Sequence, residues 1–232
     1  MDRRAAAIRS VQQRLGHVFA DQALLDRALT HASAGSGAVK IADNERLEFL
    51  GDRVLGLAIA HALMLRDGEA QAGALARPFA HLVSRASCAR IARELGLGEA
   101  LLLPGGESRQ GARQHETILA DACEAVIAAL YLEVGFERAA AAVVGLWRPL
   151  LEEPFDPSAT NPKTALQEWA AARGHPPPQY RTLSRIGPDH GPTFRVEAAI
   201  PGQGETLGEG GSLQTAQKSA ALALLQHLKA LA

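Results

Sequence analysis

The sequence predicts a two-domain protein in which an all-α domain comes first and a small α+β domain with the order α-β-β-β-α follows. Before residue 150, apolar residues recur at the helical period and no segment alternates as a strand does. After residue 160 the period changes, and two segments alternate between apolar and polar residues. Prolines crowd the stretch between these regions, as is typical of an interdomain linker. We therefore place the domains at 1–148 and 161–232 and the linker at 149–160.

The helices of the first domain are expected where apolar residues keep the helical period between polar or glycine-containing breaks. The expected spans are 5–15, 21–29, 43–66, 74–95, 116–133 and 135–147. Asp21 is a plausible N-cap for the second helix, and Asp43 or Asn44 for the third, because their side-chain oxygens accept hydrogen bonds from the first N–H groups. Gly96 and Gly98 are expected to end the long fourth helix.

The second domain is expected to carry two helices that flank three strands. The expected spans are a helix at 161–172, strands at 179–185, 193–200 and 206–208, and a helix from 212 to about 231. Gly174 is expected to end the first helix, and Ser212 to cap the last one.

Composition excludes some classes of protein without pointing to one. The chain has 232 residues, of which 47% are apolar, so it can form sizeable cores. The net charge of the chain is −1. Residues 1–158 hold 17 Lys+Arg against 20 Asp+Glu, and residues 159–232 hold 7 Lys+Arg against 5 Asp+Glu. This difference in charge between the two regions is too small to indicate RNA binding by itself. Arginines interrupt any N-terminal signal pattern, and no apolar run has the length of a membrane span. Cys88 and Cys123 are expected to be reduced core thiols, so we expect a cytoplasmic protein without a membrane association.

Two helices concentrate carboxylates beside apolar residues. Glu45, Glu48 and Asp52 are spaced i, i+3 and i+7, so they share one face of the helix at 43–66. Asp121 and Glu124 are the only charges within 118–132. Burying a carboxylate costs several kcal/mol unless it is paired or binds a metal, so these two side chains need a cation.

The stretch 44–57, Asn-Glu-Arg-Leu-Glu-Phe-Leu-Gly-Asp-Arg-Val-Leu-Gly-Leu, resembles the signature of the ribonuclease III family of endonucleases that cut double-stranded RNA. Residues 118–132 resemble the second acidic helix of that family, and the C-terminal part resembles its double-stranded RNA-binding domain. The resemblance implies phosphodiester hydrolysis with Mg²⁺, for which Mn²⁺ can substitute, to 5′-phosphate and 3′-hydroxyl ends. It also implies a homodimer with a role in rRNA and mRNA processing.

The resemblance also implies roles for single residues. The metal ligands would be Glu48, Asp52, Asp121 and Glu124. Asp52, Glu124 and Glu45 would be catalytic, with Glu45 at the edge of the site near the substrate. Some family members carry a further glutamate where this chain has Ala72, so accessory substrate contacts differ here.

RNA contacts are implied in both domains. In the second, they would come from the first helix, from the loop between the first two strands and from the start of the last helix: Thr164, Gln167, Glu168, His190, Ser212 and Lys218. The family usually has a lysine pair after the serine, where this chain has Leu213 and Gln214. In the first domain, the loop at 107–115 offers Arg109, Arg113 and His115 to phosphates, although a solvated loop is the alternative.

Other interpretations remain open at this stage. A noncatalytic RNA-binding or ribosome-associated protein on the same fold would be expected to lack one of the four metal ligands, and none is missing. A helical phosphohydrolase acting on small nucleotides would leave the second domain unexplained. His31 could be a metal ligand or a base, but a histidine at a helix end is more often structural.

Overall fold

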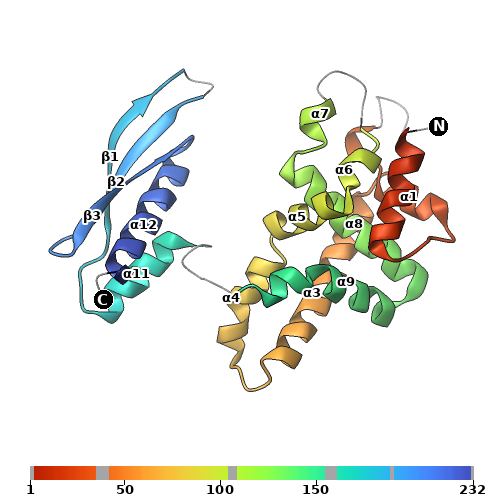
Figure 1. The fold of residues 1–232 in the computed structure, drawn as a ribbon, viewed down its shortest axis with the longest axis horizontal. Helices are drawn as coiled ribbons and strands as arrows, with labels where there is room; N and C mark the ends of the chain where they lie inside the picture. The colour runs from red at the N-terminus through yellow and green to blue at the C-terminus, as the bar shows by residue number, and fades with distance from the viewer. Residues whose placement is uncertain (1–2, 35–41, 104–108, 155–160, 189–190, 231–232) are drawn as a thin grey trace. The chain divides into compact units, whose positions relative to one another are not determined.

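The computed structural model describes residues 3–34, 42–103, 109–154, 161–188 and 191–230, with the side chains of 109 and 110 outside that description. The chain divides into two compact units, Met1–Pro154 and Phe155–Ala232 (Figure 1). Each unit has its own hydrophobic core. The predicted fold class, a helical domain followed by an α-β-β-β-α domain, is confirmed.

The first unit is built of helices joined by short connections. They are α1 (Arg3–Leu15), α2 (Gln22–Ala28), the 3-10 turn η1 (Ala32–Ala34), α3 (Glu45–Arg66), α4 (Ala72–Leu82), α5 (Arg85–Leu95), α6 (Leu97–Ala100), α7 (Arg109–Ala112), α8 (Glu116–Val134) and α9 (Phe136–Glu152). The predicted N-cap of α2 is confirmed, because Asp21 Oδ1 accepts hydrogen bonds from the N–H groups of Ala23 and Leu24, each at 3.0 Å. None of the described helices is both long and apolar enough to cross a membrane.

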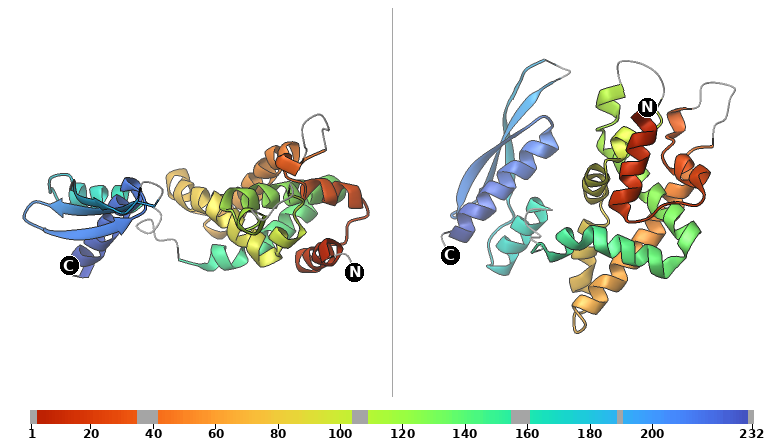
Figure 2. Two further views of the ribbon diagram at one scale, coloured as in Figure 1. Left: turned by 90° about the horizontal axis from the view of Figure 1, so that it is seen from above. Right: turned by 45° about the vertical axis from the view of Figure 1, so that its right-hand side comes forward.

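Helix α8 is the centre of this unit. Ten of its 19 residues are buried, and α3 and α5 pack along it, as the views in Figures 1 and 2 show. Small side chains make up much of its surface, which lets the neighbouring helices approach closely. Helices that start far apart in the sequence therefore meet around one element.

The prediction of one helix over 74–95 is wrong, because the chain breaks between α4 and α5. Ser84 caps α5 by accepting a hydrogen bond from the Ser87 N–H at 3.3 Å. The freed carbonyl groups at the end of α4 also have partners: Ser87 Oγ donates to His81 O at 2.7 Å, and Trp147 Nε1 donates to Leu82 O at 2.9 Å. These bonds satisfy the backbone groups that a helix break exposes. Of the two glycines expected to end the helix, Gly96 ends α5 and Gly98 lies inside α6.

The last helix of this unit is longer than predicted. Helix α9 continues through Pro149 to Glu152, so the first residues of the segment expected as linker are helical. Buried Trp147 and Leu150 hold this end of α9 against the core. Residues 155–160, the rest of the expected linker, lie outside the described part of the chain.

The second unit places two helices on one face of a three-stranded antiparallel sheet. Its elements are α11 (Pro162–Ala172), β1 (Gln179–Ile186), β2 (Thr193–Ile200), β3 (Gly204–Gly210) and α12 (Leu213–Ala230), with the strand order β1-β2-β3. Glycines on β3 admit α12: a Cβ on Gly208 would lie 2.1 Å from the backbone nitrogen of Ala220. Two of the buried β2 side chains, Ala198 and Ile200, complete the core under the helices.

Candidate active site

The five predicted carboxylates come from α3 and α8, where these two helices cross. At the crossing, a Cβ on Gly51 would lie 1.8 Å from the backbone carbonyl oxygen of Glu124. Only glycine permits this approach, because real Cβ atoms essentially never come within 3.0 Å of another atom. Glu48 and Asp52 flank Gly51 on α3, so the contact brings both helical turns beside Glu124.

The carboxylates interact with one another. Burial, and after it the charges of Asp52, Glu48 and Asp121 in that order, together raise the pKa of Glu124 to about 7. Burial also raises the pKa of Glu48, and Asp121, Glu45 and Asp52 add to the effect. The charges of Asp52, Glu48 and Asp121 all act on Glu124, so the predicted quartet lies in one region at the crossing of α3 and α8.

Basic side chains from three other segments face Asp121. Burial raises the pKa of this carboxyl group, while the charges of Arg85, His31 and His115 oppose the rise. Arg85 is the first residue of α5, and His115 is the N-cap residue of α8. Arg85 was not anticipated, because no pattern in the sequence places it near a residue on another helix. His31 Nδ1 lies 2.6 Å from Ser33 Oγ, so one ring nitrogen has a local partner.

Two further features touch the cluster. Cys88 of α5 is fully buried, and its Sγ lies 3.7 Å from Glu124 Oε1. On the exposed side, Asp52 Oδ2 pairs with Arg53 Nη1 at 2.9 Å. Sequence reasoning treated Cys88 only as a core thiol and therefore missed this contact.

The donor set fits a hard divalent cation. All of its donors are carboxylate oxygens, which Mg²⁺ prefers, and their mutual repulsion is what a cation would relieve. Within the described ranges, no three His, Cys, Asp or Glu side chains converge closely enough to hold a metal in their present rotamers.

Of the arginines predicted to contact RNA in the first unit, the structure describes the side chain of Arg113 but not that of Arg109. Arg113 Nη1 donates to the carbonyl oxygen of Gly98 at 2.5 Å, which ties the segment before α8 to α6. A guanidinium has five N–H donors, so this bond leaves capacity for a phosphate. The side chain of Arg109 lies outside the described residues. Ala72, at the position of the family's additional glutamate, is exposed at the start of α4.

In the second unit, α11 carries three of the predicted contacts on one face. Thr164, Gln167 and Glu168 are spaced i, i+3 and i+4, and the latter two are exposed. Lys163 Nζ donates to Gln217 Oε1 at 2.9 Å, which joins the first turn of α11 to the second turn of α12. The start of α12 is therefore fixed beside the start of α11.

The first turn of α12 lacks basic side chains. Ser212 caps the helix as predicted, because its Oγ accepts from the Thr215 N–H at 3.1 Å. Leu213 is 40% exposed, Gln214 is also exposed, and Lys218 follows one turn later. His190 lies outside the described residues.

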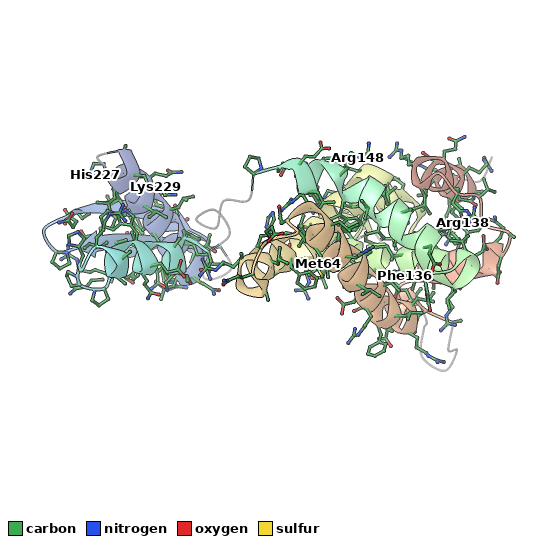
Figure 3. The ribbon with its side chains drawn as sticks, turned by 90° about the horizontal axis from the view of Figure 1, so that it is seen from below. Met64, Phe136, Arg138, Arg148, His227 and Lys229 are labelled. Atoms are coloured by element: carbon green, nitrogen blue, oxygen red, sulfur yellow. The ribbon has the colours of Figure 1, made fainter. Side chains whose placement is uncertain are left out.

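A separate groove lies between α3 and α9, on the face seen in Figure 3. It is mainly apolar, and its lining includes Phe136 and Arg148, which Figure 3 labels together with Met64 of α3. It contains none of the predicted site residues. The candidate active site is therefore the carboxylate cluster at the α3–α8 crossing.

Comparisons with known proteins give a family match for each unit. The family described as Ribonuclease-III-like matches residues 21–147, and the double-stranded RNA binding motif matches residues 162–228. A relative from Caulobacter vibrioides named Ribonuclease 3 is 50% identical over 98% of each chain. One from Azorhizobium caulinodans with the same name is 51% identical over 93% of this chain and 92% of its own.

Among solved structures, the first unit is similar to the nuclease domain of ribonuclease III from Campylobacter jejuni. The TM-score is 0.57 at 39% identity, and the match covers 61% of this chain and 96% of the other. The description of that structure refers to a region involved in dimer formation.

Proposed function

Because this chain belongs to the ribonuclease III family, we propose that it is a Mg²⁺-dependent enzyme that hydrolyses double-stranded RNA to 5′-phosphate and 3′-hydroxyl ends. Its family membership makes it an endoribonuclease, and its second unit is a double-stranded RNA-binding domain. The observation that carries the proposal is the carboxylate cluster, in which burial and three neighbouring acids raise the pKa of Glu124 to about 7. A partly buried cluster of this kind is stabilised by a divalent cation.

Glu48, Asp52, Asp121 and Glu124 would hold the metal. The chemistry that a divalent ion would supply there is activation of water as a nucleophile near neutral pH and stabilisation of the leaving oxygen. The side chains of the protein would bind the metal and orient the substrate. The backbone contact at Gly51 keeps α3 and α8 in place, so ligands from both helices face the same region. Glu45, exposed at the start of α3, lies where a substrate can reach it.

Basic residues beside the acids suit an anionic substrate. Arg85 acts on Asp121 as a permanent cation, so positive charge stands next to the metal ligands, and His31 and His115 also act on Asp121. A phosphodiester is attracted to such charge, while the metal ligands alone would repel it. Arg109 and Arg113 would extend this basic edge towards the loop before α8.

The second unit would hold the duplex by its shape. A-form RNA is recognised through 2′-hydroxyl groups in the minor groove and through phosphates across the major groove. We assign Thr164, Gln167 and Glu168 of α11 to the first minor-groove contact, and the loop with His190 to the second. The start of α12, with Ser212 and Lys218, would face phosphates, where helix N–H groups also point.

The enzyme would act as a homodimer, with one site for each strand. Phe49 and Leu57 on α3 are 65% and 58% exposed, and the guanidinium of Arg53 lies 4.0 Å from the centroid of the Phe49 ring. Large apolar side chains exposed along one helix suit a two-fold contact with the same helix of a second copy. The resemblance to the family is the basis for expecting substrates in rRNA and mRNA processing, in the cytoplasm.

The test is cleavage of a long RNA duplex by the full chain with Mg²⁺, with Mn²⁺ and with a chelator. Glu124→Gln should bind the duplex as the wild type does and lose nearly all cleavage, because it removes a metal ligand and no phosphate contact. Glu137→Gln is the matched control and should cleave normally, because Glu137 is exposed at the start of α9. If Glu124→Gln keeps more than about a tenth of the wild-type rate, the assignment is wrong. If the wild type binds duplex but never cuts it, the noncatalytic alternative holds.

A further inference from the structure

We propose that Cys88 is a positioning residue for Glu124, whose carboxylate it orients at the α3–α8 crossing through a thiol hydrogen bond. The proposal rests on the metal-dependent function proposed above. It adds a specific partner from α5 to a site whose ligands come from α3 and α8.

The contact has the geometry of a sulfur hydrogen bond. Cys88 Sγ lies 3.7 Å from Glu124 Oε1, and the Cys88 side chain is fully buried. In this bond the thiol donates and the Glu124 carboxylate accepts. Within the part of the chain that the structure describes, no other side chain is found to hydrogen-bond Glu124.

Glu124 is therefore held from two sides. From α3, the absence of a Cβ on Gly51 lets the helix backbone meet the carbonyl oxygen of Glu124, which sets the position of its main chain. From α5, the thiol of Cys88 restricts the side-chain torsions. Groups that hydrogen-bond a metal ligand orient it, and their loss typically weakens metal affinity.

Cys123 shows what a buried thiol does without this contact. It is as buried as Cys88 and precedes Glu124 on α8, yet its side chain packs in the core with no hydrogen bond to the carboxylate described. A buried cysteine of this kind acts as a small apolar residue. The two thiols therefore form a matched pair, in which only Cys88 is expected to affect the metal.

The experiment compares Cys88→Ala, Cys88→Val, Cys88→Ser and Cys123→Ala in the full chain. Two quantities are measured: the Mg²⁺ concentration that gives half-maximal cleavage of a long RNA duplex, and the rise in Tm that Mg²⁺ produces without RNA. Cys88→Ala and Cys88→Val, which lack a donor, should need more Mg²⁺ and show a smaller rise in Tm than the wild type. The increase in the Mg²⁺ requirement should be only about threefold to tenfold, because a thiol is a weak donor. Their rates at saturating Mg²⁺ should stay near that of the wild type. Cys88→Ser keeps a donor and should stay within about twofold of the wild type.

The controls separate positioning from packing and from the proposed function. The Tm of each variant without metal reports its loss of packing, and Cys123→Ala should change that value without changing the Mg²⁺ requirement. Any one of three results overturns the proposal. Cys88→Ala and Cys123→Ala could need the same Mg²⁺ concentration, or Cys88→Val could need no more Mg²⁺ than the wild type. The third such result is a Cys88→Ser variant that needs as much Mg²⁺ as Cys88→Ala. If instead the wild type needs no divalent metal at all, the proposed function fails first.

Discussion

Replacing Gly51 with alanine should separate the two helices that carry the active site. The added Cβ would stand 1.8 Å from the carbonyl oxygen of Glu124, where ordinary contact begins at 3.4 Å, so the backbones must part by about 1.6 Å. Both contacting groups are backbone in the middle of helices, so neither can turn away as a side chain does. The displacement must pass into the core around α8, which is closely packed.

The expected cost follows from two opposing effects. Overpacking of a core costs about 1–3 kcal/mol and sometimes more, and a clash between two backbones belongs at the upper end of that range. The change from Gly to Ala in a helix interior returns up to about 1 kcal/mol. A net loss of about 2 kcal/mol or more lowers the Tm by roughly 4–8 °C in a chain of this size. A shift of about 1 Å between catalytic groups can reduce the rate about 100-fold, so cleavage should fall even where the variant is folded.

Thermal unfolding followed by circular dichroism and cleavage of duplex RNA below the Tm measure both effects at one protein concentration. Gly145→Ala is the control, because Gly145 lies inside α9 and a Cβ there meets nothing within 4 Å. It should raise the Tm slightly and leave cleavage unchanged. A Gly51→Ala variant that keeps the wild-type Tm and rate would refute the close contact. Equal destabilisation by both variants would assign the effect to helical glycines in general.

Three further predictions concern charge and assembly. In metal-free buffer, Glu124→Gln should stabilise the protein by about 1–2 kcal/mol more at about pH 8 than at about pH 5, a figure reduced for the partial exposure of the side chain. The sign follows because the pKa of Glu124 in the folded protein, about 7, exceeds the usual 4.5, so the stability that this group contributes is present below pH 4.5 and is lost as the pH rises through 7. Denaturant unfolding of both proteins measures the difference in stability, and a difference that does not change with pH would contradict the prediction. The full chain should scatter light as a dimer, and Phe49→Asp should shift it towards monomer, because 65% of that ring is exposed on α3; a variant that stays fully dimeric would exclude this face. In a Glu124→Gln background, Leu213→Lys with Gln214→Lys should steepen the slope of log affinity for duplex RNA against log salt concentration by roughly 1 to 2, whatever the RNA sequence. The reason is that each new phosphate contact adds about 0.9 to this slope on B-form DNA. An unchanged slope would mean that the start of α12 does not face phosphates.

The helical break between α4 and α5 shows where local patterns stop being sufficient. Apolar periodicity continues across the break, so the sequence predicts one helix over 74–95. The structure ends α4 at Leu82 because Trp147 and Ser87 supply hydrogen bonds to carbonyl groups there. Ser84 is a recognisable N-cap type, but the donor that completes the break lies 65 residues away along the chain.

Patterns within single helices and strands determined the fold class, and patterns within single helices determined the acidic residues of the site. The spacing of Glu48 and Asp52, and the isolation of Asp121 and Glu124 in an apolar helix, are readable because a helix places residues i, i+3 and i+4 on one face. The long signature at 44–57 then connected those residues to a family.

Tertiary packing decided which residues surround those carboxylates. Gly51 is visible in the sequence as an unexplained helical glycine, but only the crossing of α3 and α8 shows that it meets the Glu124 carbonyl. Cys88 lies 36 residues from Glu124, and Arg85 reaches Asp121 from the start of another helix. Such neighbours depend on the depth and angle at which helices pack, which are set by all side chains of the core together, whereas periodicity describes one helix at a time.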